Sequence, residues 1–249
     1  MNPYGAFAHS YDRMMHDVDY AAWSSYIDAL LQKADAKSVL ECACGTGGVT
    51  IPLAKKGYRI VGTDISEDML MEARQNALRA GLRMLPFVRQ SMTALSVHKP
   101  VDAVLSVCDG VNYLTDTTDV KAFFQSASRC LKPGGLLLFD ISSEYKLSYI
   151  LGNATFTETT DEYAYIWENV FDPESRLIEM DLTFFVREGT LYRRFTEQHI
   201  QRAHTEREIL ALLEETGFSD CRAYDAFSEN PVRANSERIQ FTAIKKETI

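Results

Sequence analysis

The segment Ser38-Val-Leu-Glu41-Cys-Ala-Cys-Gly45-Thr-Gly47-Gly decides the fold class. Its first half is a short apolar run typical of a buried strand, and its second half is a glycine-rich turn. Glycines in such a turn let a ligand approach the backbone amides, because no Cβ stands in the way. Residues 49–56 then follow a helical pattern that closes at Gly57. A strand, a glycine-rich turn and a helix in this order predict the first unit of a parallel α/β sheet.

The same alternation continues along the chain. We expect a helix within residues 7–33, then strands at 59–63, 84–89, 101–107 and 135–141, and helices at 66–80 and 120–131. A further helix at 205–216 and strands near 222–227 and 238–245 complete the pattern. The predicted fold is α/β, a Rossmann-like doubly wound sheet of seven strands with the last strand antiparallel. It comprises residues 1–153 and 203–249.

Residues 154–202 interrupt this rhythm with period-two alternation and turns at Asp172-Pro173 and Glu188-Gly189. They predict an antiparallel β insertion after the fifth strand. Residues 154–200 contain nine aromatic side chains, and their ten acidic residues outnumber their four arginines. Such a surface suits a small, partly apolar and cationic ligand, so we expect a lid over an acceptor. The alternatives are that the aromatics form the core of the insertion, or that the sheet is a dimer interface.

Composition excludes several classes of protein. The net charge is −9, and no basic run exceeds two residues, which disfavours a nucleic-acid-binding protein. No apolar run reaches 18 residues, and the N-terminus lacks the pattern of a signal peptide, so we expect no membrane span and a cytoplasmic protein. Five scattered cysteines indicate free thiols, and Cys42-x-Cys44 lacks the spacing of a structural zinc site. We therefore predict no metal.

The glycine-rich turn also indicates the kind of nucleotide. Asp64 ends the second predicted strand, where an acid can bind both ribose hydroxyls. Glu41 would repel a pyrophosphate but suits a cationic cofactor, and Thr50 stands where a dinucleotide motif has its third glycine. No P-loop motif is present. In the alternative interpretation the glycines serve strand–helix packing, and Asp64 only caps the helix that starts after Ser66.

At these residues the chain resembles the class I S-adenosylmethionine-dependent methyltransferases. The resemblance spans residues 1–145 and 203–249 and rests on Glu41-x-x-x-Gly45-x-Gly47, Asp64, Val101-Asp102-Ala103 and Lys132-Pro-Gly-Gly135. The segments Tyr4-x-x-Phe7-Ala8-x-x-Tyr11-Asp12, Tyr20-x-x-Trp23 and Cys108-Asp109-Gly-x-Asn112-Tyr113 are similar to a bacterial subgroup related to sugar N-methyltransferases. The resemblance implies cofactor contacts from Tyr11, Trp23, Glu41, Ala43, Gly45, Gly47, Asp64, Ile65, Met69, Ser91, Met92 and Cys108.

The family pattern assigns expected roles within that set. Glu41, Ala43 and Gly45 contact the methionine moiety and Asp64 the ribose, while Ile65 and Met69 flank the adenine. One departure concerns the adenine amine, because Gln90-Ser91-Met92 replaces the usual Asp-Met or Asp-Ala pair. Ser91 then accepts the hydrogen bond weakly, or the main chain or Gln90 does so, and the affinity for the cofactor falls.

Methyl transfer needs mainly positioning, with a base only for a protonated acceptor. Candidates near the methyl group are Tyr11 and Tyr113, and candidate bases are His199 and His204. The leading interpretation is a methyltransferase acting on a small-molecule acceptor, with an amine among the candidate acceptors. A tRNA or protein methyltransferase is the alternative, with a basic face from Arg74, Arg79, Arg83 and Arg89. A non-catalytic cofactor-binding module is the third.

Overall fold

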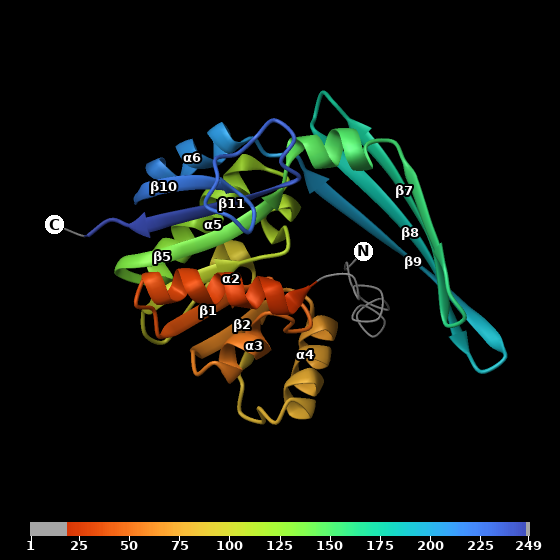
Figure 1. Ribbon diagram of the computed structural model, residues 1–249, viewed down its shortest axis with the longest axis horizontal. Coiled ribbons are helices and arrows are strands. Elements are labelled where there is room, and N and C mark those ends of the chain that lie inside the picture. Colours follow the sequence, from red (N-terminus) through yellow and green to blue (C-terminus); the bar gives the residue numbers. More distant parts are fainter. Residues whose placement is uncertain (1–18, 248–249) are drawn as a thin grey trace.

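The computed structural model describes residues 19–247, which form two sheets (Figure 1). The larger sheet has the strand order β3-β2-β1-β4-β5-β11-β10. Strands β1 to β5 pair in parallel, and β11 is antiparallel to both β5 and β10. This confirms the predicted seven-stranded doubly wound sheet. Its strands are β1 (Ser38–Cys42), β2 (Arg59–Asp64), β3 (Phe87–Arg89), β4 (Val101–Ser106), β5 (Leu131–Ser142), β10 (Phe218–Asp225) and β11 (Arg238–Lys245).

Helices cover both faces of this sheet, as a parallel sheet requires. Helices α5 (Thr117–Cys130) and α6 (Glu206–Glu215) pack on one face through buried residues such as Phe123 and Leu213. Helices α2 (Tyr20–Lys33) and α3 (Thr50–Lys55) pack on the other through Leu31 and Leu53. Helix α4 (Glu67–Arg79) begins at the Ser66 cap and buries Leu70 with its neighbours. The apolar periodicity of the sequence thus places a core on each side of the sheet.

The third strand differs from the sequence-based prediction. We expected residues 84–89, but only Phe87–Arg89 pair with β2. Met84 is 92% exposed, so its apolar character reflects a surface position and not a buried strand. The fifth strand is longer than expected, because Lys132 to Gly135 lie within the strand Leu131–Ser142.

The insertion is a separate antiparallel sheet of order β6-β7-β8-β9, reached from β5 through a π-helical turn, η3 (Lys146–Leu151). Its strands are β6 (Thr155–Thr159), β7 (Tyr163–Asp172), β8 (Leu177–Glu188) and β9 (Leu191–Arg202). The sheet stands beside the α/β domain, on the side where β5 leaves it (Figure 1). None of the helices within residues 19–247 is long and apolar enough to cross a membrane.

One face of the inserted sheet carries most of its buried side chains, apolar and polar together, and two of its nine aromatic residues are buried there. Tyr163 and Phe184 are buried together, and a second cluster contains Ile178 and Met180. The register pairs Tyr163 with Val186 and Asn169 with Met180, so these side chains share one face with His199, which pairs with Met180. The aromatic bias therefore has a structural explanation as well as a functional one. The dimer interface stays a prediction.

Asp102 fixes the amino ends of β1 and β4, opposite the end that carries the glycine-rich turn. Its Oδ2 accepts hydrogen bonds from the amides of Lys37 and Ser38 at 3.0 and 2.8 Å, and its Oδ1 accepts one from Lys132 Nζ at 2.6 Å. Burial opposes ionisation, but the Lys132 and Ser38 donors outweigh it and hold the pKa of Asp102 well below its ordinary value.

We expect Asp102→Asn to lower the free energy of unfolding by about 1.5–3 kcal/mol at pH 7, because a charged acceptor of several donors is lost. Since the folded-state pKa is depressed, this contribution is present above pH 4 and disappears as the pH falls further. Denaturant unfolding at pH 7 and pH 3 measures it. As a control, the variant should bind the cofactor with unchanged affinity, because Asp102 lies at the opposite end of the strands. A variant as stable as the wild type at pH 7 would refute this role of Asp102.

Candidate active site

A cavity of about 320 Å³ lies at the carboxyl ends of β1, β2 and β4. Most residues predicted to contact the cofactor line it, namely Glu41, Ala43, Gly45, Asp64, Ile65, Met69, Ser91, Met92 and Cys108. Tyr113, a candidate for the transfer site, lines it too, from the short 3₁₀ helix η2 (Gly110–Tyr113). The structure therefore brings together residues from Glu41 to Tyr113 of the sequence, at the edge where doubly wound sheets bind nucleotides.

The glycine-rich turn has a left-handed backbone that brings amides to the cavity wall. Ala43, Gly45 and Gly47 have φ values of 51°, 52° and 84°. A Cβ on Gly45 would meet no atom within 4 Å, so this glycine is needed for its backbone conformation. A Cβ on Gly47 would lie 3.2 Å from Ile51 and 3.3 Å from Phe87. Gly47 does not line the cavity, and the packing interpretation fits it better than cofactor contact does.

Glu41 is the most unusual residue of the site, because a carboxylate is buried at the end of a central strand. It is 2% exposed, and Thr50 Oγ1 donates a hydrogen bond to its Oε2. Burial raises the pKa of Glu41 to about 8, although the Thr50 hydrogen bond opposes the shift. A buried carboxylate beside a cavity suits a cationic ligand group, whose charge would favour its ionised form. Thr50, noted in the sequence only as a departure from a dinucleotide motif, holds this carboxylate.

Asp64 has a structural role and also faces the cavity. Its Oδ2 accepts a hydrogen bond from the Gly45 amide at 2.9 Å, and its Oδ1 accepts one from the Ser66 amide at 2.9 Å. Burial raises the pKa of Asp64, and these backbone amides partly offset the rise. The capping interpretation is therefore correct in part, since Asp64 joins the glycine-rich turn to the start of α4. Its place in the cavity also leaves it available to ligand hydroxyls.

The opposite wall suits a flat apolar ring. Ile65 is 56% exposed and Met69 is buried behind it, both at the start of α4. The two side chains that could bind an adenine amine are already engaged within their loop. Gln90 exchanges hydrogen bonds with the main chain of Ser96, and Ser91 Oγ accepts from the Thr93 amide while capping η1 (Met92–Ala94). Of the options set out from the sequence, the main chain fits best.

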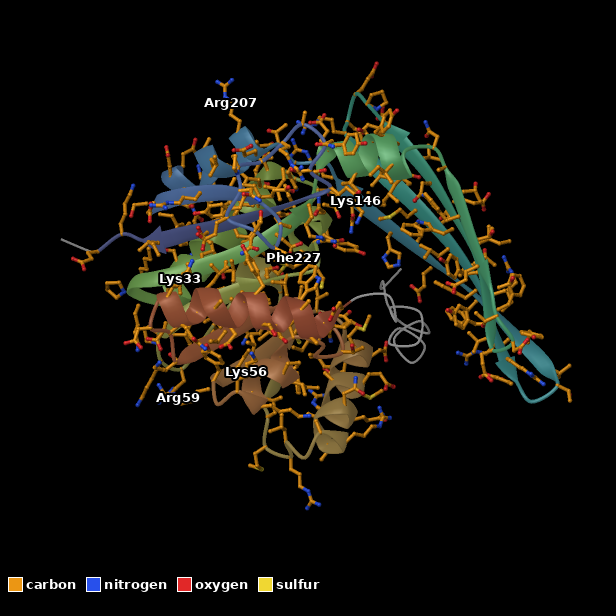
Figure 2. The ribbon with its side chains drawn as sticks, in the orientation of Figure 1. Lys33, Lys56, Arg59, Lys146, Arg207 and Phe227 are labelled. Carbon is orange, nitrogen blue, oxygen red and sulfur yellow. The ribbon has the colours of Figure 1, made fainter. Side chains whose placement is uncertain are left out.

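The two N-terminal residues predicted to contact the cofactor are Tyr11 and Trp23. Tyr11 lies outside the described residues. Trp23 lies away from the cavity, because its ring packs against Phe227 at 4.6 Å and beneath the Arg238 guanidinium at 5.1 Å. Figure 2 shows Phe227 beside helix α2, in keeping with this contact. Tyr20, one turn earlier, lines the cavity instead.

Tyr20 is one of the cavity-lining residues that sequence reasoning missed. A Cβ on Gly48 would lie 2.7 Å from the Tyr20 ring, so Gly48 is what lets helix α2 approach the glycine-rich turn. Gly48 was visible as the third glycine of the turn, but its partner lies 28 residues earlier. Helical spacing alone could not tell which of Tyr20 and Trp23 faces the cavity, because they lie on adjacent parts of the same helix surface.

The transfer-site candidates Tyr113 and His199 meet, although Tyr113 lies in η2 and His199 in β9 of the inserted sheet. Tyr113 Oη is 3.2 Å from His199 Nδ1, and the two rings are edge to face. His199 is 5% exposed, and burial lowers its pKa to about 4. It is therefore neutral at pH 7. His204, the other candidate base, is fully buried at the end of β9 and lies 3.0 Å from the Leu114 carbonyl through Nε2, so it supports the junction of the two sheets.

Comparison with known proteins identifies the chain. Residues 39–135 match the family described as a methyltransferase domain. The inferred methyltransferase YqeM of Bacillus subtilis (strain 168) is 36% identical over 247 residues, which cover 99% of this chain and 98% of YqeM. The chain belongs to the class I S-adenosylmethionine-dependent methyltransferases. S-adenosylmethionine is therefore its cofactor, and the buried Glu41, the Asp64 carboxylate and the Ile65–Met69 wall fit that cofactor's ammonium, ribose and adenine.

Two solved structures extend the comparison. An S-adenosylmethionine-dependent methyltransferase from Clostridium acetobutylicum ATCC 824 has a TM-score of 0.89 and 35% identity, covering 98% of this chain and 99% of that one. A sugar N-methyltransferase from Streptoalloteichus sp ATCC 53650 has a TM-score of 0.78 and 17% identity, covering 96% of this chain and 93% of that one. The second likeness shows a shared fold across the inserted sheet as well as the α/β domain.

We expect Asp64→Asn to weaken S-adenosylhomocysteine binding by about 1.5–3 kcal/mol, because a neutral amide replaces a charged acceptor of ribose hydroxyls. Asp64→Ala should in addition lower the free energy of unfolding by about 1–3 kcal/mol, since the amides of Gly45 and Ser66 lose their acceptor. Calorimetric titration and denaturant unfolding separate the two effects. Unchanged affinity in Asp64→Asn would show that Asp64 is only a structural cap.

The raised pKa of Glu41 predicts a pH-dependent stability for the ligand-free protein. Between pH 6.5 and 8 the folded chain holds a proton on Glu41, whose pKa is about 8, while the unfolded chain has lost it. His199 and His204 are neutral in the folded protein but half protonated in the unfolded chain at pH 6.5, so they contribute an opposite slope at the lower end of this window. Glu41 contributes a slope of its own, a fall in the free energy of unfolding as the pH rises through the window.

Glu41→Gln should remove most of this slope, because glutamine can still accept the Thr50 hydrogen bond and does not titrate. Denaturant unfolding at intervals from pH 6.5 to 8 measures the slope in both proteins. Equal slopes in wild type and variant would show that Glu41 is ionised in the ligand-free protein, contrary to its burial.

Proposed function

We propose that this methyltransferase acts on an amine nitrogen of a small-molecule acceptor held between the cofactor cavity and the inserted sheet. The observation that carries the proposal is the contact between Tyr113 and His199. Tyr113 lines the cofactor cavity, and His199 belongs to the buried face of β9. Their contact puts two polar groups where the cofactor cavity meets the second sheet, which is where an acceptor must lie to reach the methyl group.

The charge of the inserted sheet supports a cationic or amine acceptor. Glu158 and Glu197 belong to the same face as His199, according to the strand register. Glu158 accepts a hydrogen bond from Tyr163 Oη at 3.0 Å, and Glu197 is 8% exposed. Carboxylates among aromatic rings favour a cation over an anion. The sugar N-methyltransferase with the same fold is consistent with an acceptor of this class, although its identity of 17% supports the fold alone.

The chain's residues then have defined tasks. When bound, S-adenosylmethionine would supply the methyl group of its sulfonium to the acceptor nitrogen, and its sulfur would leave as a neutral thioether. Glu41 and Asp64 hold the donor, and Tyr113 and His199 accept hydrogen bonds from the acceptor N–H and so direct its lone pair towards the methyl carbon. His199 stays neutral because it is buried, and it therefore does not repel the sulfonium. The surplus proton of the product passes through this pair to solvent.

The tRNA or protein methyltransferase has less support. Three of the four arginines proposed for its basic face are engaged locally. Arg74 pairs with Glu67 at 2.7 Å, Arg79 Nη1 donates to Asn76 at 2.8 Å, and Arg89 Nε donates to the Ile65 carbonyl at 2.9 Å. The non-catalytic module predicts cofactor binding without transfer to any acceptor.

A panel of small-molecule amines, each paired with its hydroxyl analogue, tests the acceptor class with methyl-labelled cofactor. We expect label on amines and none on the matched hydroxyl compounds. Tyr113→Phe and His199→Gln should each reduce kcat about 10- to 100-fold and leave S-adenosylhomocysteine affinity within threefold. His98→Gln, on an exposed loop, is the matched control and should keep full activity. Transfer to hydroxyl compounds alone, or full activity in both site variants, would contradict the proposal.

A further inference from the structure

The loop that connects β4 with η2 has a strained backbone beside the cofactor. Cys108 and Asp109 follow one another with φ values of 60° and 54°, a left-handed conformation that is costly for residues other than glycine. Cys108 and Gly110 line the cavity, so the conformation of this loop shapes the cofactor site. Such a conformation persists only when the surroundings hold it. The question is which contacts do so.

Asp109 is held from three directions. Its Oδ1 accepts a hydrogen bond from Arg238 Nη2 at 2.7 Å, and its own amide donates to Asp140 Oδ2 at 3.2 Å. Its Oδ2 accepts a hydrogen bond from Gln201 Nε2 at 3.0 Å. Arg238 and Asp140 belong to the large sheet, whereas Gln201 belongs to β9 of the inserted sheet.

The charged groups around Asp109 are Arg238, Asp140 and Lys146. Burial would raise the pKa of Asp109, but Arg238 and Lys146 outweigh it and lower the pKa. Figure 2 shows Lys146 where the chain leaves the α/β domain for the inserted sheet. Asp109 is therefore an ionised acceptor, which strengthens the hydrogen bond from Gln201.

Strand β9 contacts this loop and the adjoining η2 at three points. His199 meets Tyr113, Gln201 donates to Asp109, and the Arg202 carbonyl accepts a hydrogen bond from Asn112 Nδ2 at 2.9 Å. Gln201 and Asn112 are 4% and 0% exposed, so these contacts are not made by mobile surface groups. A movement of β9 must therefore move the loop that carries Cys108, or break these bonds.

We infer that the Gln201–Asp109 hydrogen bond is a latch that couples the docking of the inserted sheet to the conformation of the cofactor loop. Gln201 is a positioning residue, because it acts on the cavity only through Asp109. A cofactor that stabilises the loop also stabilises the docked sheet, and by thermodynamic reciprocity the docked sheet favours cofactor binding. The inference rests on cofactor binding and not on the class of acceptor.

Hydrogen exchange of the full-length protein, with and without S-adenosylhomocysteine, tests the latch. In the wild type the ligand should slow exchange at residues 107–114 and also at residues 199–203. In Gln201→Leu the ligand should still slow exchange at residues 107–114, but its effect at residues 199–203 should be at least fivefold smaller. Without ligand this variant should also exchange faster at residues 107–114. Gln198→Leu is the matched control, because Gln198 is exposed on the same strand and donates to Asp181 within the inserted sheet. It should behave as the wild type does.

The Gln201→Glu variant should show a pH-dependent effect, which a simple loss of packing cannot produce. It places a second carboxylate beside Asp109, so the latch should fail at pH 8 and recover at pH 5.5, where the carboxylate pair shares a proton. Protection factors, which correct for the intrinsic pH dependence of exchange, measure this. A wild-type response in Gln201→Leu, or no pH difference in Gln201→Glu, would overturn the latch. Absence of methyl transfer to amines would contradict the proposed acceptor and leave these readouts unaffected.

Discussion

The site is organised around one costly feature, the burial of the Glu41 carboxylate at the end of a central strand. An isolated buried charge is unfavourable, so in the ligand-free protein Glu41 keeps its proton, with a pKa near 8. A cationic group of the ligand offsets this cost when it binds beside the Glu41 carboxylate. The same feature explains why Thr50 stands where a dinucleotide motif has glycine, since its hydroxyl holds the carboxylate in place. A cationic cofactor and not a pyrophosphate follows from this arrangement.

The second constraint is that an acceptor must reach the methyl group from outside the α/β domain. The chain meets it by placing a separate sheet opposite the cavity and by joining the two through Tyr113, Asp109 and Asn112. All three belong to one short loop that also lines the cofactor cavity or adjoins it. In the proposed complex the same few residues would contact cofactor and acceptor, and contacts from both sheets sustain the left-handed backbone of Cys108 and Asp109.

Much of this was predictable from the sequence because it depends on local patterns. The period-two and helical alternations and the glycine-rich turn are short-range features, and the structure confirms them. Glu41 and Asp64 could be placed in the cavity because the carboxyl ends of neighbouring parallel strands meet at one edge. The length of β3 was overestimated because exposed Met84 looks like a strand residue in the sequence.

Long-range packing could not be predicted in the same way. That Tyr20 and not Trp23 lines the cavity depends on the close approach of α2 to Gly48, and the burial of Trp23 depends on Phe227 and Arg238, about 200 residues later. The Tyr113–His199 contact depends on how the inserted sheet docks, which no local pattern specifies. His199 and His204 looked equivalent in the sequence, but His199 meets the phenol group of Tyr113, whereas His204 meets the backbone carbonyl of Leu114.

The central claim is that Glu41 releases its proton to solvent when a cationic ligand binds. Calorimetry of S-adenosylhomocysteine binding at pH 7, in two buffers of different ionisation enthalpy, counts that proton directly. With a free pKa near 8 and a bound pKa lowered by the ligand ammonium, the wild type should release close to one proton, and Glu41→Gln should release close to none. A wild-type protein that binds the ligand without releasing a proton would contradict the account.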